Sequence, residues 1–152
     1  FKPPFIGSPL KFTPVLFEND TLQLFDNVII HRFPVHHTVE CYGYHFKIND
    51  RSLGFITDTT SNENSEYAQN VDHCDLLIHE CYLPDEKVKS NPLKPNQHTS
   101  SSGLIQFCKK ANATIVCFIH HNPEGYKNQI LDEVKKGIPS VWPAVDLESY
   151  DI

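Results

Sequence analysis

The spacing of hydrophobic positions changes near Asp58, and this change divides the chain into two differently built parts. Before Asp58, short apolar or alternating runs are separated by turn-forming residues, which is the pattern of β-strands. The expected strands are a pair within Phe12–Phe25, broken at Glu18–Asp20, followed by Val28–Val35, Glu40–Ile48 and Leu53–Asp58. The first part of the chain is therefore predicted to be a sheet.

After Asp58, helical and strand-like patterns alternate, which predicts an α/β fold class. The expected elements are a helix at Ser61–Asn70 with Ser61 as its N-cap, a strand at Cys74–His79, a long loop at Pro84–Gln97, a helix at Gly103–Asn112 capped within Thr99–Ser102, a strand at Thr114–Ile119, a helix at Tyr126–Lys136 closed by Gly137, and a strand at Val141–Ile152. Residues 1–11 carry several prolines and are expected to form a linker or arm, so residues 12–152 form the domain.

Net charge, the length of the apolar runs and the cysteine pattern limit which classes of function are compatible with the sequence. The net charge of −6 argues against a broad nucleic-acid face, and no apolar run approaches the about 18 residues of a membrane span. The 5 cysteines include no Cys-x-x-Cys pair and are expected to be reduced, which predicts a cytoplasmic compartment. Zinc–thiolate ligation by Cys81 is an alternative. The chain contains no Met, even at position 1, and is expected to be a piece of a longer protein.

Several apolar segments end abruptly in a histidine or a carboxylate, among 9 histidines in total. These endings are His36-His37 after Ile29–Val35, Asp58 after Leu53–Thr57, His79-Glu80 after Leu76–Ile78, and His120-His121 after Thr114–Ile119. Imidazole nitrogen and carboxylate oxygen are ligands of zinc and related ions, so we expect His37, Asp58 and His120 to converge as metal ligands. A carboxylate such as Asp58 can bridge two metals about 3.5–4 Å apart. The spacing leaves open which histidine of each pair faces inward, and whether Asp58 instead caps the following helix.

Glu80 and His98 suggest a different role. A carboxylate next to a loop histidine can orient the imidazole, which can then protonate a leaving alkoxide. We therefore expect Glu80 and His98 to be catalytic. The remaining histidines are expected to be structural or surface residues, including His79 at a strand end and His73 beside Asp72.

Motifs in sequence order resemble those of ribonuclease Z. They are His37–Tyr44, which resembles the segment with a metal-binding histidine, Thr57–Thr59 ("GDT"), Leu76–Glu80 ("HEAT"), His98–Ser101 ("HST"), Val116–His120 (the last metal histidine) and Trp142–Asp146 (the closing strand). The resemblance implies a metallo-β-lactamase αββα sandwich and a hydrolase of the phosphodiesterase type with two divalent metals, usually zinc, with manganese or iron as alternatives. It implies that a metal-bound hydroxide is the nucleophile. It also implies that His37, Asp58 and His120 are the metal ligands, and that Glu80 and His98 are the proton-transfer pair.

Departures from the family pattern refine these expectations. The family's His-x-His-x-Asp-His motif is absent and would lie upstream of Phe1, so this chain resembles the C-terminal half of the domain and would need the N-terminal half as a partner. A tight turn replaces the arm that grips tRNA, so a small phosphodiester or another ester is the expected substrate, with tRNA as an alternative. Thr57 and Cys81-Tyr82 replace the usual Gly and Ala-Thr. The alternatives are an arylsulfatase- or lactonase-like enzyme or a non-catalytic fragment, and a homodimer is compatible with each.

Overall fold

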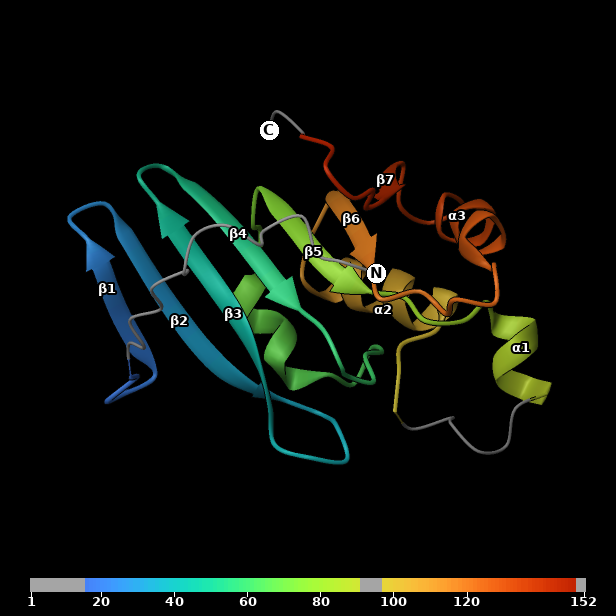
Figure 1. The fold of residues 1–152 in the computed structure, drawn as a ribbon, viewed down its shortest axis with the longest axis horizontal. Coiled ribbons are helices and arrows are strands. Elements are labelled where there is room, and N and C mark those ends of the chain that lie inside the picture. The colour runs from blue at the N-terminus through green and yellow to red at the C-terminus, as the bar shows by residue number, and fades with distance from the viewer. Residues whose placement is uncertain (1–15, 91–96, 150–152) are drawn as a thin grey trace, which may run out of the picture.

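The strands form a single sheet whose spatial order is their order along the chain. The computed structural model describes residues 16–90 and 97–149, and within them the sheet has 7 strands (Figure 1). They are β1 (Thr21–Phe25), β2 (Val28–Val35), β3 (Cys41–Ile48), β4 (Arg51–Ile56), β5 (Leu76–Glu80), β6 (Ile115–Ile119) and β7 (Ser140–Pro143). Pairing is antiparallel from β1 to β4 and parallel from β4 to β7. The sheet is therefore mixed, and its change of pattern falls at β4.

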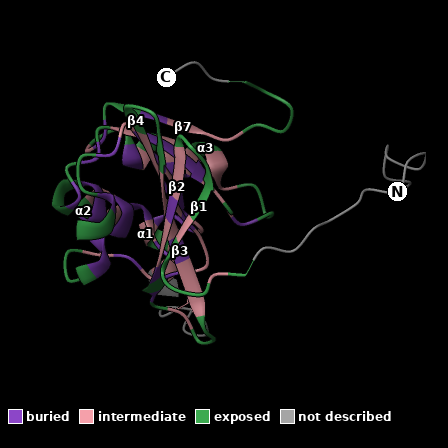
Figure 2. Cartoon of the chain, turned by 90° about the vertical axis from the view of Figure 1, so that its left-hand side faces the viewer, coloured by how far each residue is buried: buried purple, intermediate pink, exposed green. Residues whose placement is uncertain are grey.

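Helices cover one face of the sheet. The 3-10 helix η1 (Glu66–Val71) contacts β2 and the α-helix α2 (Ser101–Lys110), and α2 contacts α3 (Lys127–Val134), which also contacts β7. The edge-on view shows α2 beside the sheet (Figure 2). The main hydrophobic core lies between these helices and the sheet, because alternating positions of each strand point toward them. Its largest fully buried members include Phe107, Phe118, Ile56, Leu77 and Leu104.

Gly43 allows the ring of Phe33 to lie directly against the backbone of β3 inside this core. It pairs with Phe33 of the neighbouring strand β2. A Cβ atom at Gly43 would lie 2.5 Å from the Phe33 ring, so a larger residue would displace that ring. Phe33 in turn stacks on Tyr67 of η1, with ring centroids 6.4 Å apart. The glycine thus lets an aromatic side chain of the sheet reach the helical layer.

The opposite face of the sheet is apolar but less covered. Cross-strand neighbours of β2, β3 and β4 form a groove of about 320 Å³ there, lined by Phe17, Ile30, Tyr44, Phe46 and Phe55. The guanidinium of Arg32 lies over the rings of Phe17 and Tyr42, at 5.3 and 4.9 Å from their centroids. This aromatic surface is distinct from the core under the helices.

The elements differ from the sequence prediction in several places. The helix expected at Ser61–Asn70 is replaced by η1, because Ser61 and Asn62 bond other groups: Ser61 Oγ lies 2.8 Å from His79 Nε2, and Asn62 Oδ1 accepts from the Asn64 N–H at 2.8 Å. Such side-chain bonds compete with helix formation.

The loop expected at Pro84–Gln97 contains a short helix, α1 (Asp85–Ser90), which starts directly after Pro84. Proline suits the start of a helix because it needs no amide donor there. Residues 91–96 of that loop lie outside the described residues, as do the arm at 1–11 and the start of the first predicted strand.

The last strand is also shorter than predicted. β7 ends at Pro143, and Val145 and Leu147 beyond it are 41% and 104% exposed. Apolar residues are common on protein surfaces, so their presence alone did not indicate a strand. No helix in the described ranges has the length and apolar character needed to cross a membrane.

Candidate metal and catalytic site

The carboxyl ends of several strands meet at one edge of the sheet. β4, β5 and β6 are mutually parallel, so Asp58, Glu80 and His120 emerge at that edge. β2 runs in the same direction as β4, because each is antiparallel to β3 between them. His37, which follows β2, therefore reaches the same edge. Sheet topology thus gathers residues that are far apart in sequence.

Asp58, His98 and His120 come together as a group that can hold a metal ion. Each offers one ligand atom, and these atoms lie within 4.8 Å of one another; it is the one such group among the residues that the structure describes. The rings of His98 and His120 are 5.1 Å apart and nearly perpendicular, at 86°. His120 Nδ1 lies 3.6 Å from Asp58 Oδ1. Imidazole nitrogens with a carboxylate are a donor set that suits zinc and its neighbours, so these residues fit a divalent transition metal.

Two members of this group hold unusual backbone conformations. Asp58 has φ of 50° and His120 has φ of 52°. Non-glycine residues rarely adopt this left-handed region, and such strain is concentrated at functional sites. Thr57 supports the pair, with its Oγ1 3.4 Å from Asp58 Oδ2 and 3.5 Å from His120 Nδ1. Thr57 thus lies between the two side chains and contacts both.

Glu80 connects the histidines to the protein interior. Its side chain has 0% exposure, and both carboxylate oxygens accept hydrogen bonds. Oε1 accepts from the backbone N–H groups of Thr59 at 2.8 Å and Thr99 at 3.1 Å. Oε2 lies 2.9 Å from His98 Nδ1 and 3.2 Å from His120 Nδ1. A carboxylate bonded to Nδ1 fixes the tautomer in which Nε2 has the free lone pair, the arrangement found behind metal-binding histidines.

The predicted histidine pairs are placed differently. His120 faces the group, whereas the ring of His121 packs edge-on against Phe118 at 6.4 Å. His37 lies beside the group, with its ring 6.0 Å from that of His98, but its nitrogens are not among the clustered donors. The exposed His36 instead meets Tyr67, edge-on at 6.0 Å. Of the residues predicted from the sequence, the structure thus clusters Asp58, Glu80, His98 and His120 and leaves His37 at the margin.

His79 and Cys81 are buried away from the group. His79 has 0% exposure, lies 2.8 Å from Ser61 Oγ through Nε2 and donates from Nδ1 to the Glu80 carbonyl at 2.7 Å. Burial lowers the pKa of His79, so the ring stays neutral. Cys81 belongs to the hydrophobic core, and burial raises the pKa of its thiol. Cys81 is not part of the group of clustered donors, so the structure gives no support for its ligation of zinc. All five cysteines are free.

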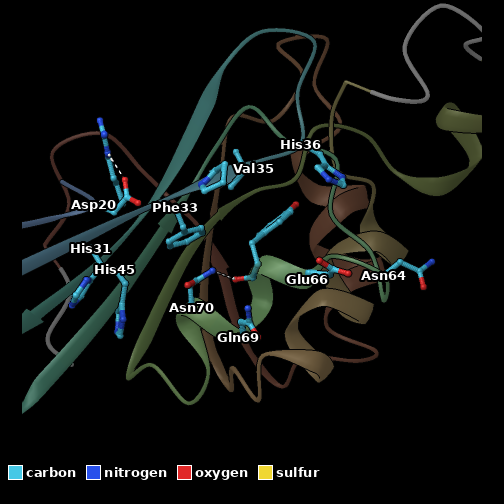
Figure 3. A pocket seen from close by; sticks show the side chains of 13 residues that line it. Asp20, His31, Phe33, Val35, His36, His45, Asn64, Glu66, Gln69 and Asn70 are labelled. Atoms are coloured by element: carbon cyan, nitrogen blue, oxygen red, sulfur yellow. Dashed lines mark hydrogen bonds and ion pairs between the residues drawn. The ribbon is translucent and has the colours of Figure 1, made fainter. Parts of the chain in front are cut away.

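A large groove lies elsewhere on the molecule. It has a volume of about 960 Å³, runs between β2, β3 and η1, and is bordered by His31, His36 and His45 (Figure 3). His31 bonds Thr21 Oγ1 at 2.8 Å, and burial lowers the pKa of His45. The lining of this groove includes none of Asp58, His98 and His120. The group of clustered donors and this groove are therefore separate features.

Sequence reasoning missed the contribution of Thr59, Thr99 and Tyr82. Thr59 and Thr99 bond Glu80 through backbone N–H groups, and Thr99 Oγ1 also donates to the Thr59 carbonyl at 2.8 Å. Tyr82 stacks on the His98 ring, with centroids 4.2 Å apart. Backbone donors leave no mark in a sequence, but the small hydroxylated residues after Asp58 and His98 were a usable indication for the threonines.

Comparison with known proteins places the chain in a family. The sequence profile of the beta-lactamase superfamily domain matches residues 6–121, which is most of the chain. The chain belongs to the beta-lactamase superfamily. No curated protein sequence matches this superfamily member.

Solved structures confirm the metallo-β-lactamase fold. The metallo-beta-lactamase fold protein YhfI from Bacillus subtilis has a TM-score of 0.72 at 18% identity, covering 86% of this chain and 51% of that one. The short form of human tRNase Z has a TM-score of 0.60 at 18% identity, with coverages of 85% and 46%. A diphosphatase from the PhnP family has a TM-score of 0.59 at 21% identity, with coverages of 83% and 43%. The chain thus spans about half the length of these superfamily structures.

Proposed function

We propose that the protein containing this chain is a metal-dependent hydrolase that cleaves a small phosphodiester, in the manner of ribonuclease Z. The observation that carries the proposal is Glu80, a fully buried carboxylate that bonds His98 and lies 3.2 Å from His120 beside Asp58. A structural core rarely buries a carboxylate, because removing its hydration is costly unless strong partners replace water. Here those partners are imidazoles that open onto the edge of the sheet.

His37, Asp58 and His120 are the residues that would hold two divalent ions, most simply zinc, with Asp58 shared between them. Bound divalent ions supply positive charge that polarises the substrate and activates the attacking water. Asp58 and His120 already lie 3.6 Å apart. The ring of His37 lies 6.0 Å from that of His98, beside the same group.

Glu80 and His98 form the pair proposed to assist proton transfer. Glu80 Oε2 holds His98 Nδ1 at 2.9 Å, which leaves Nε2 to carry a proton to the leaving oxygen. The side chain of His98 is 14% exposed, so the ring is largely shielded yet reachable. His98 also belongs to the group of clustered donors, so it has a second candidate role as a metal ligand. Metal content of the His98→Ala variant separates ligation from proton donation.

Charge and loop length favour a small substrate. The chain carries a net charge of −6, which disfavours a long polyanion such as tRNA. Only Asn49 and Asp50 connect β3 to β4, so no long arm projects from that turn. Human tRNase Z and the PhnP-family diphosphatase, both similar in fold, are named for acting on phosphate-containing substrates. Arylsulfatase-like or lactonase-like ester hydrolysis is the second candidate, because the same site polarises other esters.

The apolar face of the sheet supports a further part of this proposal. Phe17, Tyr44, Phe46 and Phe55 line a groove on the face opposite the core. In the proposed complete domain, this face packs against the sheet of the N-terminal half, which also brings the His-x-His-x-Asp-His motif. Burial of aromatic side chains there would stabilise the association of the two halves.

Elemental analysis of the complete protein tests the metal assignment. We expect about two transition-metal ions per site. Zinc, manganese and iron all at background level would refute the proposal and favour a non-catalytic protein.

The His98→Ala variant tests the proton-transfer role. It should lower kcat by about 10²–10⁴-fold while metal content and Tm stay nearly unchanged. The deficit should shrink for a nitrophenol leaving group, which needs little protonation. His73→Ala is the matched control, because the side chain of His73 is 74% exposed at the other end of β5. An equal loss for good and poor leaving groups, or a loss of metal, would reassign His98 as a ligand.

A further inference from the structure

Tyr82 joins the two loops that carry the histidines of the site. It follows Glu80 by two positions, just after β5. Its backbone N–H donates to the Thr99 carbonyl at 2.9 Å, next to His98. Its carbonyl accepts from the Asn122 N–H at 3.0 Å, two residues after His120. The backbone of Tyr82 therefore ties both histidine loops to the end of the same strand.

The side chain of Tyr82 contacts the same two histidines. Its ring stacks on His98, with centroids 4.2 Å apart and planes inclined by 22°. It meets His120 edge-on, with centroids 5.7 Å apart and planes inclined by 67°. One aromatic ring thus touches both imidazoles of the site, with the face of one and the edge of the other in contact.

These contacts complete what Glu80 leaves undetermined. Glu80 Oε2 holds His98 by a hydrogen bond at Nδ1 and lies 3.2 Å from Nδ1 of His120, and a ring held at one atom can still turn about that contact. For His98, a flat surface against the ring removes this freedom, because turning would separate the stacked faces; for His120, the edge contact blocks rotation toward Tyr82. Tyr82 is half-buried and lies outside the hydrophobic core cluster, beside the histidines of the site.

We propose that Tyr82 is a positioning residue, which fixes the planes of His98 and His120 so that their Nε2 atoms point into the site. The chemical use of those Nε2 atoms rests on the proposed function. The orientation of the two rings does not depend on it. The position matters because misplacing a reacting group by about 1 Å can cost about 10²-fold in rate. The ring, rather than the hydroxyl, carries the role.

Three variants of the complete protein test this inference. Tyr82→Phe keeps the ring, whereas Tyr82→Leu and the unbranched Tyr82→Met remove the flat surface and keep all backbone bonds. In the metal-free protein, NMR signals of the His98 and His120 ring C–H groups should be unchanged in Tyr82→Phe. In Tyr82→Leu they should lose their ring-current displacement, and the cross-peaks between the two rings should weaken.

Kinetics give the second measurement. Tyr82→Leu should lower kcat for a small phosphodiester by about 10- to 100-fold, with KM and Tm nearly unchanged, and Tyr82→Phe should restore kcat to within about threefold. If Tyr82→Leu does not fold, Tyr82→Met answers the same question. Unchanged ring cross-peaks without the aromatic ring would overturn the inference, as would an equal loss in Tyr82→Phe. If the wild type neither binds zinc nor hydrolyses esters, the proposed function fails, and the NMR comparison still decides the role of Tyr82.

Discussion

Replacing Glu80 by glutamine tests the site with minimal change of shape. The amide oxygen can still accept from the backbone N–H groups of Thr59 and Thr99, as Oε1 does now at 2.8 and 3.1 Å. The amide nitrogen then faces His98 Nδ1 and His120 Nδ1, where Oε2 now accepts at 2.9 and 3.2 Å. Donors therefore meet donors, unless both imidazoles change tautomer.

Two magnitudes follow from this geometry. Loss of the charge-assisted bonds should destabilise the metal-free protein by about 1–3 kcal/mol, part of the loss being offset because a buried charge is removed. If the imidazoles change tautomer instead, Nε2 carries the proton and has no lone pair for a metal. Metal affinity should then fall by about 10–100-fold, as it does when partners behind metal ligands are removed.

The assay is zinc affinity by competition with a chelator, together with urea unfolding of the metal-free protein. Asp75→Asn is the matched control. Asp75 precedes β5 at its opposite end and accepts from Ser52 N at 2.7 Å, Ser52 Oγ at 2.9 Å and Arg51 Nη1 at 3.0 Å. Its neutralisation should lower Tm without altering zinc affinity. Wild-type zinc affinity in Glu80→Gln would refute the reasoning, and Glu80 would then be a purely structural carboxylate.

Three further perturbations have defined outcomes. Asp58→Ala should lose metal and activity together with the fold retained; full activity with bound metal would refute its role as a ligand. Gly103→Ala should destabilise by about 1–3 kcal/mol in urea titrations, because its Cβ would lie 2.5 Å from the Ser61 carbonyl oxygen, and an unchanged midpoint would contradict this contact. Burial lowers the pKa of His79, so the unfolded chain binds its proton first, and this residue should reduce stability as pH falls below about 6.5. Between pH 7 and 5, the free energy of unfolding should fall less steeply in His79→Gln than in the wild type, measured by the same urea titrations. Equal slopes in the two proteins would argue against this role of His79.

The sheet was largely predictable from the sequence because apolar spacing marks its strands directly. Val28–Val35 is observed as predicted, and the strands before Asp58 and His120 differ from prediction by a few residues. The misplaced helix after Ser61 has a tertiary cause. Ser61 bonds His79, a partner 18 residues away, and no local pattern encodes that choice.

The site was predictable in outline because parallel strands end at one edge. That reasoning gave Asp58, Glu80 and His120 from strand ends, and the pairing of Glu80 with His98 from the chemistry of a carboxylate beside a loop histidine; the family resemblance implied the same roles. The orientation of His37 and the packing of Tyr82 depend on side-chain rotation and on loop backbone, which strand periodicity does not determine. The cytoplasmic compartment and the metal roles of individual residues stay predictions.

The sequential order of the strands also has a consequence for synthesis of the chain. Each strand pairs with the one made just before it, from β1 to β7, so the sheet can grow by addition at one edge as the polypeptide emerges. Asp58 and Glu80 would be in place while β5 is still the last strand. The partner of both, His120, arrives only with β6. A nascent chain that stops short of β6 would therefore have Glu80 paired with His98 but would lack His120, and only release of the finished β6 would complete the site.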